Sequence, residues 1–210
     1  MPEDCGNHGC LRNIKAKPVC ICSGIVVVVL IVVVFLIHIP WLWPTRPRFI
    51  LQDVTVFVFN LSSPHLLTTT FQITISARNP NPKTGIYYDY LHVYASYMDQ
   101  QITFPTTIPP TYQEHKEHNV WSPFVYGTSV SIAPLNGAAL SCEQNGGLVA
   151  LMICADGRVR WKFWIVSRRS HLSIRCPAYI NPWNQAAGTI VGENAVKYTL
   201  ATKCSVSVSV

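Results

Sequence analysis

Apolar positions form their longest unbroken run at residues 19–39, where the sequence contains no Asp, Glu, Lys or Arg. A helix of this length spans about 32 Å and can cross a hydrocarbon core of about 30 Å. Pro18 suits the first position of a helix, and Pro40 marks its end. Trp41 and Trp43 then fall at the membrane surface, where aromatic side chains are enriched. The pattern predicts a single transmembrane helix over residues 19–39.

A cleaved signal peptide is the alternative explanation of this apolar run. The apolar regions of signal peptides are only about 7–15 residues long and end at a site of small residues. The sequence after Ile39 offers no such site. We therefore expect the segment to remain in the protein as an uncleaved signal anchor.

Beyond residue 48 the apolar pattern changes to a period of two. Between Phe71 and Arg78, apolar and polar residues alternate, which is typical of a half-buried strand, whereas residues 53–61 are apolar on both faces, as in a strand covered on both sides. The other strands are expected at 86–97, 125–132, 148–155, 158–165, 172–176 and 196–206, and only 136–141 suggests a helical turn. Many short strands with Gly, Pro and Asn breaks predict an all-β fold, an antiparallel β-sandwich of the immunoglobulin or fibronectin III type.

The Asp156-Gly157 pair predicts a two-residue hairpin turn, because this dipeptide favours the turns that join antiparallel strands. Such a turn places Cys154 opposite Val159. The residues that would then share the core face are Leu148, Met152, Cys154, Val159, Trp161, Phe163 and Ile165. Arg158, Arg160 and Lys162 are left in solvent.

The domain order follows from the anchor and the charges around it. We expect a tail at 1–18, the transmembrane helix at 19–39, a stiff Pro/Arg linker at 40–48 and one β-sandwich domain at 49–210. The basic residues before the helix are Arg12, Lys15 and Lys17, and those after it are Arg46 and Arg48. This excess on the N-terminal side predicts a cytosolic N-terminus and an outer C-terminal domain.

Asn60 lies in the Asn-Leu-Ser acceptor for N-glycosylation, on the predicted outer side. Cys142, Cys154, Cys176 and Cys204 form an even set in the same domain, which suits an oxidising compartment. By strand parity Cys176 and Cys204 both point inward, but four cysteines allow three pairings and parity does not choose among them.

The remaining cysteines lie at the predicted cytosolic membrane face, where reversible palmitoylation occurs; unmodified thiols are the alternative. They are Cys5, Cys10, Cys20 and Cys22.

Composition excludes several classes of function. The formal net charge is +6, but only 12% of the residues are charged, so no polybasic nucleic-acid protein is indicated. No nucleophile elbow, phosphate-binding loop or zinc-protease helix occurs in the sequence. Glu114, His115, Glu117 and His118 are clustered, but we interpret them as an exposed loop without a third metal ligand. We expect no enzyme, metal or cofactor.

Three stretches together resemble the plant harpin-induced and non-race-specific-disease-resistance family, whose outer domain is of the late-embryogenesis-abundant group two class. They are Asn79-Pro80-Asn81-Pro82-Lys83-Thr84-Gly85-Ile86-Tyr87-Tyr88-Asp89, Trp121-Ser122-Pro123, and Asp156-Gly157-Arg158-Val159-Arg160-Trp161-Lys162. The resemblance covers residues 19 to about 206.

The resemblance implies a plasma-membrane protein, plasmodesmata included, that takes part in defence or stress signalling. It also implies a Cys176–Cys204 disulfide and leaves Cys142 with Cys154 as the less certain second pair. The partners expected are the lipid bilayer, through residues 19–39, and a protein or cell-wall partner, with Arg158, Arg160 and Lys162 as candidate contacts. A lipid or hydrophobic-ligand binder, an abiotic-stress-protective membrane protein and, without support from any motif, a hydrolase are the alternatives.

The Asn-Pro-Asn stretch also has an explanation from its residues alone. Asn before Pro favours a turn with side chains bonding nearby backbone, and Gly85 permits backbone conformations that other residues resist. An architectural role is therefore one interpretation of the motif, and a ligand surface is the other.

Overall fold

The chain divides into an N-terminal unit, Met1–Pro44, and a domain, Thr45–Val210. The computed structural model describes residues 23–34, 44–63, 65–163, 166–184, 188–191 and 195–209. Residues 23–34 are helical, and both ends of the predicted span at 19–39 lie outside the described residues. Within the described residues, no helix has the length and apolar character needed to cross a membrane.

The domain consists of two antiparallel sheets. The first has the order β11-β12-β1-β2-β7, with β8 also pairing with β2. Its strands are β1 (Arg48–Ser63), β2 (Leu66–Arg78), β7 (His118–Trp121), β8 (Phe124–Ser131), β11 (Thr189–Ile190) and β12 (Val196–Lys203).

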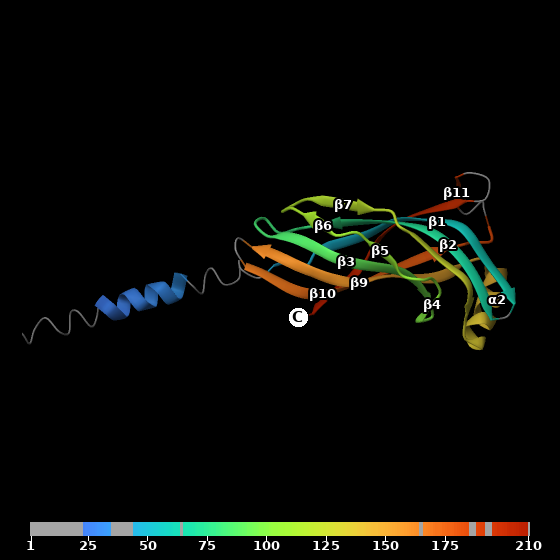
Figure 1. Ribbon diagram of the computed structural model, residues 1–210, viewed down its shortest axis with the longest axis horizontal. Coiled ribbons are helices and arrows are strands. Elements are labelled where there is room, and N and C mark those ends of the chain that lie inside the picture. The colour runs from blue at the N-terminus through green and yellow to red at the C-terminus, as the bar shows by residue number, and fades with distance from the viewer. Residues whose placement is uncertain are drawn as a thin grey trace, which may run out of the picture. The chain divides into compact units, whose positions relative to one another are not determined.

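The second sheet has the order β13-β10-β9-β3-β4, with β5 and β6 also pairing with β3. Its strands are β3 (Gly85–Tyr97), β4 (Gln100–Gln101), β5 (Thr106–Ile108), β6 (Thr111–Gln113), β9 (Val149–Phe163), β10 (Val166–Ile180) and β13 (Ser205–Ser209). Figure 1 shows the long strands β3, β9 and β10 running side by side, with the helix α2 (Pro134–Gly146) at one end of the domain.

The inner faces of both sheets contribute to one hydrophobic core. The ring of Phe49 on β1 contacts that of Tyr88 on β3, with centroids 6.4 Å apart, and Tyr88 contacts Trp121 on β7 at 5.3 Å. Inward residues of β2 alternate with half-buried ones, as its period of two predicts. The antiparallel β prediction is confirmed, and the arrangement is consistent with a β-sandwich.

The prediction that residues 53–61 are covered on both sides is wrong. β1 carries bulges between Leu51 and Asp53 and between Val56 and Val58, and each bulge shifts which residues face inward. Phe57 is therefore 37% exposed and Val58 42% exposed, although both are apolar.

The predicted Asp156-Gly157 turn is also wrong, because β9 continues through both residues. Gly157 pairs with Leu91 on β3 and with Leu172 on β10. A Cβ atom at Gly157 would lie 2.1 Å from the carbonyl oxygen of Tyr90, beside the β3 bulge between Tyr88 and Tyr90. Glycine is needed here for the close approach of two backbones, and not for a turn.

A continuous β9 changes the faces assigned to its first half. Leu148, just before the strand, is 58% exposed, and Met152 lies on the outer face at 36% exposure. Val159 and Trp161 point into the core as predicted. Cys154 is on the outer face but is nevertheless buried. The side chains of Phe163 and Ile165 are outside the described residues.

Candidate functional site

The Asn-Pro-Asn motif connects β2 to β3, and the amide of Asn79 forms its centre. Nδ2 of Asn79 donates to the carbonyl oxygens of Thr84 at 2.8 Å and Glu114 at 2.9 Å. Oδ1 of Asn79 accepts from the backbone N–H of Asn81 at 3.0 Å and from its Nδ2 at 2.9 Å. Asn79 is 0% exposed, and all four hydrogen-bonding positions of its amide are occupied. This amide holds the fold and has no position left for a ligand.

Asn81 extends these hydrogen bonds to the segment by which the chain enters the domain. Its Oδ1 accepts from the N–H of Thr45 at 2.7 Å, and its Nδ2 donates to the carbonyl of Thr45 at 2.8 Å. Thr45 is thereby hydrogen-bonded to the connection between β2 and β3, which comes 36 residues later in the sequence. These contacts support the architectural interpretation of the motif.

Gln113 on β6 completes this buried polar cluster. Its Nε2 donates to the carbonyl oxygens of Ala77 at 2.9 Å and Glu117 at 3.1 Å, and its Oε1 accepts from the hydroxyl of Tyr88 at 3.0 Å. Burial raises the pKa of Tyr88, which keeps the phenol protonated as a donor. Sequence reasoning missed Gln113, because a glutamine in a polar segment carries no sign of its distant partners.

Asp89, the last residue of the motif, lies on the other side of β3 and faces outward. Nε and Nη2 of Arg160 both lie 2.7 Å from Oδ1 of Asp89. The guanidinium carbon of Arg160 is also 4.4 Å from the ring centroid of Tyr87. Arg160 thus combines an ion pair with a cation–π contact, which fixes its direction on the surface.

The outer face of the second sheet gathers more cations around this pair. Directly opposite one another across β9 and β10 are Arg160 and Arg169, and Arg158 and His171. Arg158 lies 5.9 Å from the ring centroid of Tyr90, and Nζ of Lys162 lies 5.5 Å from that of Tyr112. We call this surface the basic face; it comprises Arg158, Arg160, Lys162, Arg169, His171 and Arg175 with the rings of Tyr87, Tyr90 and Tyr112.

One end of the basic face covers a buried thiol. Nη1 of Arg175 lies 3.1 Å from Sγ of Cys154, and this contact raises the pKa of Arg175. Beside it the hydroxyl of Tyr94 donates to Asp156 at 2.8 Å, and burial together with this hydrogen bond raises the pKa of Tyr94 to about 12. Cys154 is 0% exposed and is therefore no part of the accessible surface.

The basic face can attract an anionic partner, because its cations outnumber its carboxylates. The carboxylates on it are Asp89 and Asp156, and both already accept hydrogen bonds from the neighbours described above. Exposed charges of this kind attract partners over about one Debye length, so such binding weakens in salt.

Arg158, Arg160 and Lys162 were expected in solvent; Arg158 and Lys162 are exposed and Arg160 is half-buried. Arg169 and Arg175 were missed, although the period of two on β10 could have placed them on the same face.

The cysteines of the domain do not form two bridges. Cys176 on β10 is bonded to Cys204, where the chain passes from β12 in the first sheet to β13 in the second. Cys142 and Cys154 are free, so the less certain pair is not formed. Cys142 is exposed on α2, whereas the thiol of Cys154 is enclosed under Arg175 on the outer face of β9.

The other predicted site residues lie apart from the basic face. Asn60 is exposed on β1, with its Nδ2 3.3 Å from Oγ of Ser62. His115 is exposed in the loop between β6 and β7, and His118 begins β7. The cysteines predicted as palmitoylation sites, Cys5, Cys10, Cys20 and Cys22, are all outside the described residues.

Comparison with known proteins gives a consistent result over the whole chain. Residues 74–176 match the family model described as "Late embryogenesis abundant protein". NDR1/HIN1-like protein 12 of Arabidopsis thaliana is 58% identical over 98% of this chain and 99% of its own. NDR1/HIN1-like protein 1 of the same plant is 56% identical over 98% of this chain and 100% of its own. NDR1/HIN1-like protein 26 is 40% identical over 72% of each chain.

Proposed function

Because the chain belongs to the NDR1/HIN1-like family of late embryogenesis abundant proteins, we propose that it is a non-enzymatic membrane protein of plant defence or stress signalling. Residues 19–39 anchor it in the plasma membrane as a single span, and the β domain lies outside the cell. The domain acts by binding a protein or an acidic wall polymer. The basic face is the observation that carries this proposal.

Two properties of the basic face suit it for contact with a partner. Arg158, Arg160 and Lys162 each lie over a tyrosine ring, which restricts their side chains, so less conformational entropy is lost when they bind. Guanidinium groups match the geometry of carboxylates, which both acidic proteins and acidic wall polymers carry. Anchoring raises the local concentration of the face at the cell surface, which compensates for weak single contacts.

The proposed topology predicts one glycan at Asn60. Its side chain is exposed on β1, so an oligosaccharide fits there without disturbing the core. Deglycosylation should lower the apparent mass by one glycan, and Asn60→Gln should abolish that shift. A C-terminal domain that stays protected from protease in sealed right-side-out plasma-membrane vesicles would show the opposite orientation.

Plants that lack the intact gene test the function itself. They are complemented with the intact chain, a chain without residues 19–39, or Arg158→Gln/Lys162→Gln, and pathogen growth is scored after infection. A matched control, Lys116→Gln/Arg168→Gln, removes the same charge from exposed positions outside the basic face. We expect the intact chain and the matched control to restore resistance and the other two to fail.

Each arm of this experiment contradicts a different part of the proposal. Unchanged resistance after removal or overexpression of the intact gene would exclude a role in defence. Full rescue by the chain without residues 19–39 would exclude the need for an anchor. Full rescue by Arg158→Gln/Lys162→Gln would exclude the basic face as the contact surface.

A further inference from the structure

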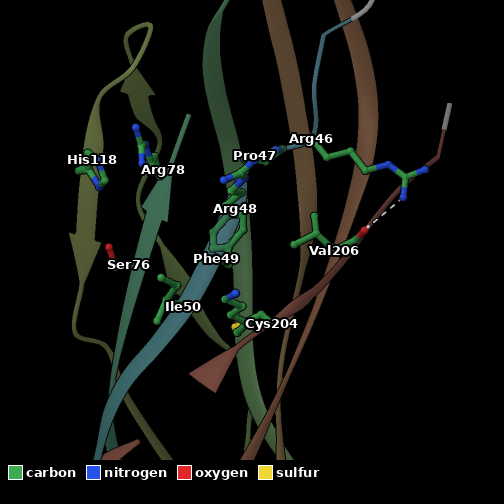
Figure 2. A pocket seen from close by; sticks show the side chains of 11 residues that line it. Arg46, Pro47, Arg48, Phe49, Ile50, Ser76, Arg78, His118, Cys204 and Val206 are labelled. Carbon is green, nitrogen blue, oxygen red and sulfur yellow. Dashed lines mark hydrogen bonds between the residues drawn. The ribbon is translucent and has the colours of Figure 1, made fainter. Parts of the chain in front are cut away.

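A pocket of about 490 Å³ lies in the domain where the chain enters β1. Its lining comes from the segment before β1, from β1, β2 and β7, and from the passage between β12 and β13; it consists of Arg46, Pro47, Arg48, Phe49, Ile50, Ser76, Arg78, His118, Lys203, Cys204 and Val206. In Figure 2, Arg48 and Phe49 lie between Arg78 and His118 on one side and Val206 on the other. This volume is within the range of small-molecule sites, about 300–1,000 Å³.

The lining is basic and contains no carboxylate. Arg48 lies directly opposite Arg78 across β1 and β2, and Arg78 lies directly opposite His118 across β2 and β7. Lys203 on β12 lies opposite Ile50 on β1. Ile50 comes two residues after Arg48, so the two side chains project from the same face of β1. Within the described residues, no acidic side chain lies at ion-pair distance from Arg48, Arg78 or Lys203. Like charges directly opposite one another destabilise a sheet, and a bound anion would offset this repulsion.

The pocket also offers apolar contact beside these charges. Its apolar lining consists of Phe49 and Pro47, which are buried, together with Ile50, Val206 and Cys204. Arg46 donates to the carbonyl oxygen of Val206 at 3.4 Å, so the segment before β1 is held against the start of β13 (Figure 2). A lining that carries both cations and apolar groups suits a ligand that joins an anionic group to a hydrocarbon part.

We propose that this pocket binds the phosphate of a membrane phospholipid, with Arg48, Arg78 and Lys203 as its ligands. The choice of a lipid over a soluble phosphate ester rests on the apolar lining and on the membrane anchor of the proposed function. Only residues 40–44 separate the proposed span from Thr45, a length of at most about 18 Å when fully extended. The pocket lining begins one residue later, at Arg46, so the chain keeps it within reach of the headgroups.

The test uses the full chain, solubilised in non-ionic detergent, and measures lipid adducts by native mass spectrometry. The probes are dioctanoyl phosphatidic acid, dioctanoyl glycerol, which lacks the phosphate, and inorganic phosphate. We expect phosphatidic acid to bind more tightly than either of the others. Arg48→Gln/Arg78→Gln should weaken this binding by about tenfold or more, because each arginine loses a charge-assisted hydrogen bond. Arg158→Gln/Lys162→Gln removes the same charge from the basic face and should leave the binding within about twofold.

Three results would overturn the proposal. If the Arg48→Gln/Arg78→Gln variant binds phosphatidic acid as tightly as the unchanged chain does, these arginines do not form the site. If Arg158→Gln/Lys162→Gln weakens the binding equally, the binding reflects only a general attraction to positive charge. Inorganic phosphate that binds as tightly as phosphatidic acid would show a site for a soluble anion. None of these measurements depends on the orientation of the protein in the membrane or on pathogen resistance. A negative result would therefore not contradict the proposed role in defence, and loss of that role would not contradict a positive result.

Discussion

Asn79→Ala should lower the free energy of unfolding of the domain by about 3–4 kcal/mol. The truncation removes every hydrogen bond of a fully buried amide. The backbone N–H of Asn81 and the carbonyl of Thr84 then lose partners in buried positions, and the carbonyl of Glu114 loses one in a partly buried position. Buried polar groups without partners cost about 1–3 kcal/mol each, and partial relaxation reduces the sum.

Urea denaturation of the oxidised Thr45–Val210 unit, followed by tryptophan fluorescence, measures this loss. The matched control is Asn60→Ala in unglycosylated protein, because Asn60 is exposed on β1 and its side chain makes a local contact with Ser62. The control should change the free energy of unfolding by less than about 0.5 kcal/mol. Equal stabilities of Asn79→Ala and the control would contradict the architectural role of the motif.

The class of fold was predictable because strand periodicity is a local property. The alternation from Phe71 to Arg78 needs only its own residues to be recognised, and β2 follows it. Residues 100–121 contain four short strands, β4 to β7, that were not predicted. Strands of two to four residues are too short to show a period, and their pairing to β2 and β3 depends on the long strands beside them.

Gly157 shows why a correct local rule gave a wrong register. Asp-Gly favours a tight turn, but the reason for glycine here is the backbone of Tyr90 on another strand. In a hairpin Cys154 and Val159 would share a face, whereas in one continuous strand they lie on opposite faces. The outward direction of Arg158 and Lys162 remained correct, because it depends only on Val159 and Trp161 within the same half of β9.

The candidate sites depend on contacts between distant parts of the chain. Asn81 hydrogen-bonds Thr45, and Arg160 pairs with Asp89 from 71 residues away. The residues of each pair were visible in the sequence, and the three stretches that carry the resemblance include Asn81, Asp89 and Arg160. Their partners could be found only once the sheet register was known.

Loss of the Cys176–Cys204 disulfide should lower the free energy of unfolding by about 3–4 kcal/mol. The bond closes a loop with a sequence separation of 28, and its main effect in the chain-entropy description is to restrict the unfolded state. It also joins β10 to the point where the chain leaves β12, and the N–H of Cys204 donates to the carbonyl oxygen of Phe49 at 3.0 Å. The bond therefore links β10 of the second sheet directly to the end of β12 in the first sheet.

The variant Cys176→Ala/Cys204→Ala measures this contribution by urea denaturation, with Cys142→Ala as the control. Cys142 is free and exposed on α2, so its replacement should change the free energy of unfolding by less than about 0.5 kcal/mol. Peptide mapping under non-reducing conditions checks the pairing itself. A linked peptide that joins Cys176 to Cys142 or Cys154 would contradict the bond seen here, and equal stabilities of the double variant and the control would show that the crossing at Cys204 is held by core packing alone.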